Sequence, residues 1–194
     1  MTSDEEIIES VLRGGVDRYG ELVERYQQSM WRLAYSMVGN FEDAKEISQN
    51  GFFKAYRHLA GFRRSARFST WLYRIIINEC KDFFRRKGRR PAFVQLSSDP
   101  ESEEAVLFEV ADPRGDPSDV VAQRELAEAL SQAIERLPMK QKTAFVLHRL
   151  QGMSIEEISQ VMGCRRGTVK AHLFRASEHL RILMEPFVKE EAHR

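Results

Sequence analysis

The chain has 194 residues, of which 42% are hydrophobic and 30% charged, which suits one globular domain or two small ones. Its 30 Lys and Arg residues against 29 Asp and Glu residues leave a formal net charge of +1, which excludes an overall electrostatic attraction to nucleic acid. The acidic start MTSDEEII lacks the apolar core of a signal peptide, no apolar run is long enough to cross a bilayer, and the two cysteines lie in different segments. We therefore expect a cytoplasmic protein without membrane insertion or a disulfide framework.

The first segments predict helices without any catalytic pattern. Ser3 and Glu6 form a capping box for a short helix through Leu12, and a longer helical pattern closes at the turn Gly39-Asn40. Residues 41–59 are again helical, with an apolar side and an opposite side that carries Asp43, Glu46, Gln49, Asn50 and Phe53. An aromatic ring among short polar side chains is a reasonable anchor for a partner protein, although one exposed aromatic residue often has no role.

A basic and aromatic stretch follows. Residues 61–69 predict a loop with several arginines and Phe68, and residues 70–86 predict a helix whose buried stripe is Leu72, Ile75, Ile76, Cys80 and Phe83. Its outer stripe is Trp71, Arg74, Asn78, Lys81 and Arg85. Cations beside aromatic rings suit unpaired nucleic acid, because cations hold the backbone and rings stack on bases. Alternatively, Trp71 and Phe68 are boundary core residues and the arginines are simply solvated.

Residues 91–115 interrupt the helical pattern. Prolines recur here, the Ser97-Ser98 pair adds a turn signal, and acidic residues dominate from Val94 to Asp119. This composition predicts an extended, flexible acidic linker between two basic modules. Asp116-Pro117 then restarts a helix, Pro138 begins the next, and the tail from Met184 is expected to fray.

The most informative stretch is residues 154–181, which reads as a helix-turn-helix. Ser154 and Glu157 form a second capping box, Gly163 ends the first helix, and a second helix runs from about Arg166 to Arg181. One face of that second helix mixes cations with very small residues: Gly167, Thr168, Lys170, Ala171, Phe174 and Arg175. A recognition helix in a major groove requires such a face. An ordinary helical hairpin with a solvated charged face is the alternative, and an outward-facing Phe174 counts against it.

The sequence offers no constellation for enzyme chemistry. It has no phosphate-cradling glycine loop and no nucleophile elbow, and its histidines do not pair with Cys80 or Cys164 at zinc spacing. We expect no catalytic residue, no metal, no cofactor and no small-molecule substrate.

Taken together, these stretches resemble the sigma-70 family of transcription initiation factors, in its small extracytoplasmic-function type. The segments that carry the resemblance are GELVERY (20–26), EDAKEISQNGFFKAY (42–56), FSTWLYRIIIN (68–78), and residues 137–163 with GTVKAHLFRA (167–176). The resemblance implies an all-α fold with two small helical domains, an N-terminal bundle (1–90) and a C-terminal helix-turn-helix domain (116–194), joined by the acidic linker (91–115). Asn50-Gly51 and Lys45 depart from the family pattern, and Gly51 costs about 1 kcal/mol of helix stability relative to alanine.

The resemblance also implies partners and roles. The chain would bind core RNA polymerase, recognise promoter DNA and help to open it, under the control of an anti-sigma factor. The β′ clamp of the polymerase would contact Asp43, Glu46, Gln49, Asn50 and Phe53, and the C-terminal domain would sit on the β flap. The residues implied for reading and melting the −10 element are Arg63, Arg67, Ser69, Trp71, Arg74, Asn78, Lys81 and Arg85. Those implied for the −35 element are Arg165, Arg166, Thr168, Lys170, Ala171, Phe174 and Arg175.

Two other classes of protein share some of these features. A conventional activator or repressor would bind DNA without polymerase and would carry an effector pocket, whereas the N-terminal segment offers basic stripes. An adaptor with a degenerate DNA-binding module would carry an acidic or apolar recognition face, whereas residues 165–175 are basic.

Overall fold

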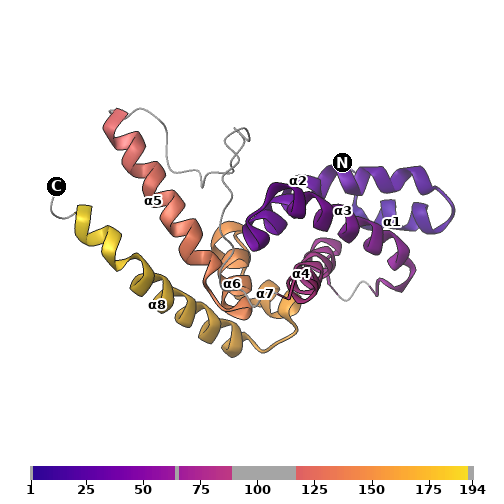
Figure 1. Ribbon diagram of the computed structural model, residues 1–194. Helices are drawn as coiled ribbons and strands as arrows, with labels where there is room; N and C mark the ends of the chain where they lie inside the picture. Colours follow the sequence, from indigo (N-terminus) through magenta and orange to yellow (C-terminus); the bar gives the residue numbers. More distant parts are fainter. Residues whose placement is uncertain (1, 64–65, 89–116, 192–194) are drawn as a thin grey trace.

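The computed structural model describes residues 2–63, 66–88 and 117–191, although not the side chains of residues 117–124 and 188–191. All regular structure in these ranges is helical, and Figure 1 shows the helices in two groups. The N-terminal bundle consists of α1 (Asp4–Leu12), η1 (Val16–Arg18), α2 (Tyr19–Val38), α3 (Phe41–Arg57), η2 (Leu59–Gly61) and α4 (Phe68–Arg86). The C-terminal module consists of α5 (Pro117–Glu135), α6 (Met139–Phe145), η3 (Val146–Leu150), α7 (Ile155–Met162) and α8 (Arg166–Glu191). The predicted all-α fold with two helical domains is confirmed, while the predicted linker lies outside the described residues.

Local capping sets the helix ends. Both predicted capping boxes form, at Ser3 with Glu6 and at Ser154 with Glu157, and each satisfies two amide groups that the first helical turn leaves free. Gly39 ends α2 at φ 73° and Gly163 ends α7 at φ 62°, a left-handed conformation that glycine adopts without steric cost. The side chain of Asn40 then caps α3 by accepting from the Asp43 amide at 3.0 Å.

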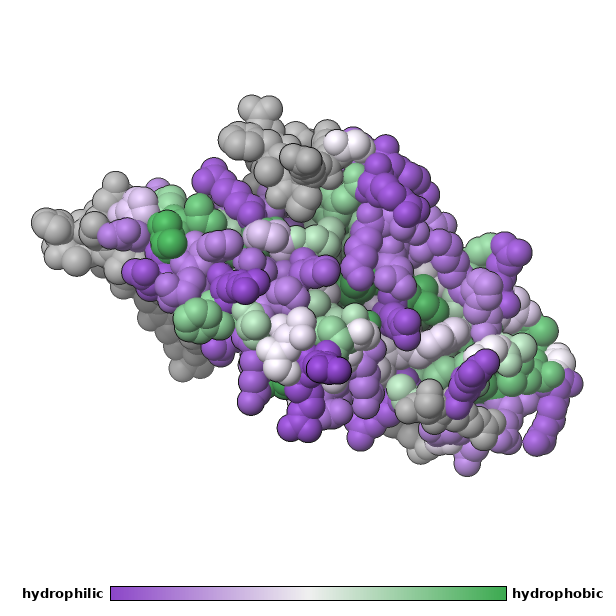
Figure 2. Space-filling view, turned by 90° about the horizontal axis from the view of Figure 1, so that it is seen from below, coloured by the Kyte–Doolittle hydropathy of each residue, from purple (hydrophilic) through white to green (hydrophobic). Residues whose placement is uncertain are grey.

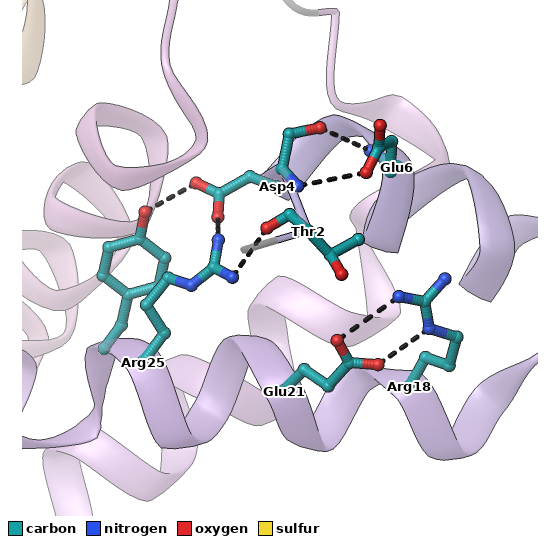
Figure 3. A network of polar contacts seen from close by, with 8 residues as sticks. Thr2, Asp4, Glu6, Arg18, Glu21 and Arg25 are labelled. Atoms are coloured by element: carbon teal, nitrogen blue, oxygen red, sulfur yellow. Dashed lines mark hydrogen bonds and ion pairs between the residues drawn. The ribbon is translucent and has the colours of Figure 1, made fainter.

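Helix α1 is fastened to α2 by apolar and polar contacts. Ile7, Ile8 and Val11 are buried, and full burial of an isoleucine side chain contributes about 2 kcal/mol. Figure 3 shows the polar part, in which the Arg25 guanidinium pairs with Asp4 and donates to the Thr2 carbonyl at 2.8 Å. Helix α1 is therefore an integral part of the N-terminal bundle.

Helices α3 and α4 approach each other closely at Gly51. A Cβ atom added to Gly51 would overlap the Cδ1 atom of Ile76, which is completely buried. Glycine at this position therefore lets the two helices pack at short range, and the packing explains why α3 tolerates a residue of low helix propensity.

Helix α4 is covered on two sides, which corrects the predicted buried stripe. Ile77 and Phe84 are buried, whereas Ile75 and Phe83 are only half-buried. At about 100° per residue, Tyr73, Ile77, Cys80 and Phe84 form one line along the helix. Helix α7 of the C-terminal module contacts α4, and the hydroxyl of Tyr73 donates to Gln151 Oε1 at 3.1 Å. The C-terminal module therefore covers a side of α4 on which only Cys80 is predicted from the sequence to be buried.

The last helix is longer than predicted. Helix α8 continues to Glu191 instead of ending near Arg181, so the expected fraying from Met184 is wrong for residues 184–191. Helix α5 packs against α8, and Leu180, Leu183 and Met184 join the hydrophobic core. This burial stabilises the extra turns. Hydrophilic residues cover most of the face seen in Figure 2, with smaller hydrophobic patches between them.

Candidate nucleic-acid and polymerase interfaces

The first candidate surface is the recognition face of α8, defined as Arg165, Arg166, Thr168, Lys170, Ala171, Phe174 and Arg175. All seven side chains are exposed, and Phe174 is 70% exposed. Val169 and Ala176, on the other side of the helix, are completely buried. Gly167 and Ala171 add almost no bulk, so a backbone can approach this face closely. The geometry matches a helix that lies in a major groove.

The second candidate surface is the α4 stripe, defined as Trp71, Arg74, Asn78, Lys81 and Arg85. Arg63, Arg67 and the last four residues of the stripe are exposed, and Ser69 is half-buried. Desolvation of its ammonium group and then the neighbouring cations Lys140 and Arg74 lower the pKa of Lys81, although the side chain as a whole is exposed. Lys140 belongs to α6, so cations of both halves of the protein add to one region of positive potential.

Trp71 is not a free stacking platform. Its ring centroid lies 5.2 Å from that of Phe62 and 5.8 Å from that of Phe68, and Phe68 is 2% exposed. Tyr26 of α2 completes the cluster at 5.8 Å from Phe68. Phe68 is therefore a core residue, as the alternative interpretation held, while the half-buried Trp71 presents one part of its ring beside the α4 stripe.

The third candidate surface is the α3 face, defined as Asp43, Glu46, Gln49, Asn50 and Phe53. Glu46, Gln49 and Phe53 are exposed, with Phe53 at 60%, and the Arg57 guanidinium lies 5.7 Å from its ring centroid. Asp43 already has a partner, because Lys87 Nζ lies 2.9 and 3.1 Å from its two carboxylate oxygens. The α3 face therefore combines an exposed aromatic ring with an acid that is held by the end of α4.

The contact between the two halves contains charged groups that the sequence analysis did not single out. Lys142 of α6 is 2% exposed, and burial lowers its pKa from 10.5 to about 8. Glu135 of α5 raises that pKa by its charge, and Glu135 packs so closely on Gly39 that a Cβ there would overlap its carboxylate. Because Lys and Glu are ordinarily surface residues in α-helices, no signal in the sequence marks Lys142 as buried or Glu135 as half-buried.

The same contact limits the distance between two arginines that are candidates for DNA binding. Arg67 lies 3.9 Å from Glu157, and Arg166 lies 3.1 Å from the adjacent Glu156. Neighbouring Cα atoms are about 3.8 Å apart and each glutamate reaches about 5 Å from its Cα atom, so the two guanidinium groups lie within about 20 Å. Arg67 belongs to the predicted −10 set and Arg166 to the predicted −35 set.

The described part of the chain offers no alternative chemistry at these surfaces. Within it, no three His, Cys, Asp or Glu side chains gather as metal ligands. No helix in the described ranges is long and apolar enough to span a membrane.

Comparison with known proteins identifies both halves. The model of sigma-70 region 2 matches residues 22–90, and the model of sigma-70 region 4 matches residues 127–180. The RNA polymerase sigma-H factor of Pseudomonas aeruginosa is 35% identical over 190 residues, spanning 96% of each chain. The ECF RNA polymerase sigma-E factor of Escherichia coli K12 is also 35% identical over 190 residues, spanning 96% of this chain and 97% of the relative.

Two solved structures share the fold. CnrH, in complex with the cytosolic domain of CnrY, aligns with a TM-score of 0.66 at 21% identity, covering 95% of this chain and 99% of CnrH. The sigma factor RpoE of Bartonella quintana, bound to the anti-sigma factor NepR, aligns with a TM-score of 0.60 at 23% identity, covering 86% and 96% of the two chains. The sequence matches over both halves show that the chain belongs to the sigma-70 family, among its extracytoplasmic-function members, and is a non-enzymatic factor of transcription initiation.

Proposed function

We propose that this factor reads a promoter with two separate surfaces while a third holds it on core RNA polymerase. The recognition face of α8 binds the −35 element as duplex, and Lys170 and Arg175 reach phosphates or base edges there. The observation that carries this assignment is the exposed mixture of cations and small residues on α8, backed by the buried Val169 and Ala176. Contacts of this type contribute about 1–3 kcal/mol each.

The −10 element is assigned to the α4 stripe together with Arg63, Arg67 and Ser69. Unstacking a base costs a few kcal/mol, and stacking on an aromatic ring returns about 1–3 kcal/mol per base. Because the cations of this surface add phosphate contacts, binding favours the strand-separated form. Trp71, supported by Phe62 and Phe68, is the ring available for this purpose.

The α3 face is assigned to the β′ clamp of the polymerase, and the C-terminal module to the β flap. The exposed aromatic ring of Phe53 among polar neighbours supports the first assignment. We further propose the boundaries 1–90, 91–115 and 116–194 for the bundle, linker and helix-turn-helix domain. The factor acts in the cytoplasm, where an anti-sigma partner restrains it by covering these surfaces.

Promoter binding requires the two halves of the protein to separate. By their positions, the −10 and −35 elements are roughly 25 base pairs apart, or about 85 Å of duplex. Arg67 and Arg166 lie within about 20 Å of each other. The arrangement of the two halves in this structure is therefore a closed state, in which the protein cannot bind the −10 and −35 elements at the same time.

Reconstituted transcription tests the proposal. Purified chain is mixed with core polymerase, and start sites on genomic templates are mapped by run-off transcription. Defined starts that depend on the chain are expected, together with permanganate-reactive thymines in the −10 element. DNA binding without polymerase and without defined starts would favour an ordinary repressor or activator, and capture of polymerase without any start would favour an adaptor.

A further inference from the structure

Helix α4 carries a buried acid that the proposed function does not use. Glu79 is 5% exposed and pairs with Nζ of Lys54 on α3. Lys54 is about half-exposed, so its charged end lies at the rim of the helix pair and reaches inward to the carboxylate. An acid is seldom buried in a helix interface unless it has such a partner.

The pair lies one turn away from the closest approach of the two helices. Gly51 faces Ile76 at the point where a Cβ would overlap, and Lys54 and Glu79 each follow three positions later on the same helix faces. The absent side chain at Gly51 brings α3 and α4 together, and the ion pair fixes them at the adjacent turn. Sliding or rotation of α4 against α3 would break the pair and leave a buried charge.

The pair also stands between two of the proposed surfaces. Lys54 follows Phe53 of the α3 face, and Glu79 follows Asn78 of the α4 stripe. A second cross-link, between Asp43 of the α3 face and Lys87 at the end of α4, joins the same two helices with the charges reversed. Polymerase contact on α3 and base capture on α4 are thus linked through short, charge-paired connections.

We propose that Lys54 and Glu79 are positioning residues for promoter opening, which hold the α4 stripe at a fixed orientation to the α3 face. This inference rests on the proposed function, since it assigns the −10 element to α4 and polymerase to α3. Neither residue touches DNA or polymerase. Their removal therefore affects opening at saturating polymerase and leaves polymerase affinity nearly unchanged.

Removing the lysine and neutralising the glutamate should affect promoter opening to different extents. Lys54→Met strands a carboxylate between two packed helices, whereas Glu79→Gln leaves Lys54 free to turn into water and keeps an oxygen that accepts its hydrogen bond. We expect Lys54→Met to reduce the open fraction at least about tenfold and Glu79→Gln only about two- to threefold. The double variant Lys54→Met/Glu79→Gln should recover to the level of Glu79→Gln, and Lys54→Arg should open like the wild type.

The experiment uses full-length chain with core polymerase on a promoter mapped by run-off transcription. Polymerase affinity is measured by fluorescence anisotropy, opening by permanganate reactivity of −10 thymines at saturating polymerase, and folding by thermal unfolding. Lys45→Met is the matched control, because it removes an exposed lysine from a different side of α3. Because Lys45 lies one turn before Gln49 of the α3 face, the control is compared in folding and in opening at saturating polymerase, and it should match the wild type in both.

Several outcomes would overturn the proposal. The first is that Lys54→Met opens the promoter as well as the wild type does. The second is that Lys54→Met loses polymerase affinity in proportion to its loss of opening. The third is that the double variant opens the promoter no better than Lys54→Met. If Lys54→Met fails to fold, Glu79→Gln must still open less than the wild type at saturating polymerase, and equal opening overturns the role. The wild type alone tests the proposed function: absence of its opening overturns both, whereas equal opening by all variants overturns only the positioning role.

Discussion

Replacing Lys142 by methionine is expected to tighten the closed state. A lysine that is 2% exposed with a pKa of about 8 instead of 10.5 carries a burial cost of about 3 kcal/mol for its charged form. Methionine has a similar shape and no charge. The cost is recovered in part, because Glu135 loses its cationic neighbour, so we expect a net gain of about 1–3 kcal/mol, or roughly five- to hundredfold in the closing equilibrium.

Cys80 provides a built-in reporter of this equilibrium. Its side chain is completely buried, burial raises the pKa of its thiol to about 12, and Lys142 of the opposite half acts on it electrostatically. Separation of the two halves uncovers this side of α4, so the rate of thiol labelling follows the open fraction. In a Cys164→Ser background, Lys142→Met should label at Cys80 roughly five- to hundredfold more slowly than the parent at about pH 7.5.

The pH dependence gives a second test with a defined sign. Below about pH 8 Lys142 is protonated in both states, so closure does not depend on its titration there. Between about pH 8 and 10.5 the open state binds more protons than the closed state, so closure of the wild type gains stability as pH rises. The intrinsic reactivity of the Cys80 thiol also changes with pH, and taking the ratio of the labelling rates of Lys142→Met and the parent at each pH removes this effect. The ratio of the two labelling rates should approach one near about pH 10.5.

The matched control is Lys170→Met, which removes an exposed lysine from the same module and should leave labelling close to that of the parent at every pH. Equal labelling of Lys142→Met and the parent at neutral pH would refute the reasoning. So would a ratio that stays constant across the titration, because the burial cost would then not come from the lysine charge.

Further substitutions test the assigned surfaces and the packing of α3 on α4. Trp71→Ala should impair promoter opening more than initial binding, because it removes a stacking contact of about 1–3 kcal/mol, and unchanged permanganate reactivity would count against this. Lys170→Ala or Arg175→Ala should weaken binding to the −35 duplex by about 1–3 kcal/mol, and equal affinity of the wild type for a cognate and a scrambled element would exclude base reading. Gly51→Ala should lower the free energy of unfolding by about 1 kcal/mol in urea titrations, since overlap with Ile76 outweighs the gain in helix propensity. Adding Ile76→Val to this variant should relieve the overlap, because it removes the Cδ1 atom. A Gly51→Ala variant more stable than the wild type would contradict the close approach of the two helices.

The local features of the fold could be predicted from the sequence, because they depend on a few neighbouring residues. Both capping boxes, the glycine ends of α2 and α7, and the exposed face of α8 are present as predicted. The roles of the predicted −10, −35 and polymerase residues stay predictions, since exposure alone does not show what a side chain binds. For Phe68 the core alternative is the correct one, because its ring packs on Tyr26 and Phe62 and is 2% exposed.

Long-range packing was not accessible to the same reasoning. Periodicity finds one apolar stripe on α4, yet Ile77 and Phe84 are also buried because a second group of helices lies against them. The predicted end of α8 is too early for the same reason, since α5 packs against α8 and the half-buried Leu183 and Met184 pack on the core. The ion pair of Lys54 with Glu79 joins residues 25 positions apart, and nothing local marks it.

Helix α4 has a different task on each side, and this explains the polar character of the contact between the two halves. One side packs on α3 through Ile76, a second side carries the stripe proposed to bind DNA, and the third is covered by the C-terminal module in this structure. An entirely apolar third side would hold the module permanently, because apolar burial contributes about 25 cal/mol per Å² with nothing to oppose it. The buried charge of Lys142 opposes that gain, and opening returns it to water. The proposed function requires a contact that forms in the free factor and yields to polymerase and promoter, and a buried charge that opposes the apolar gain meets both requirements.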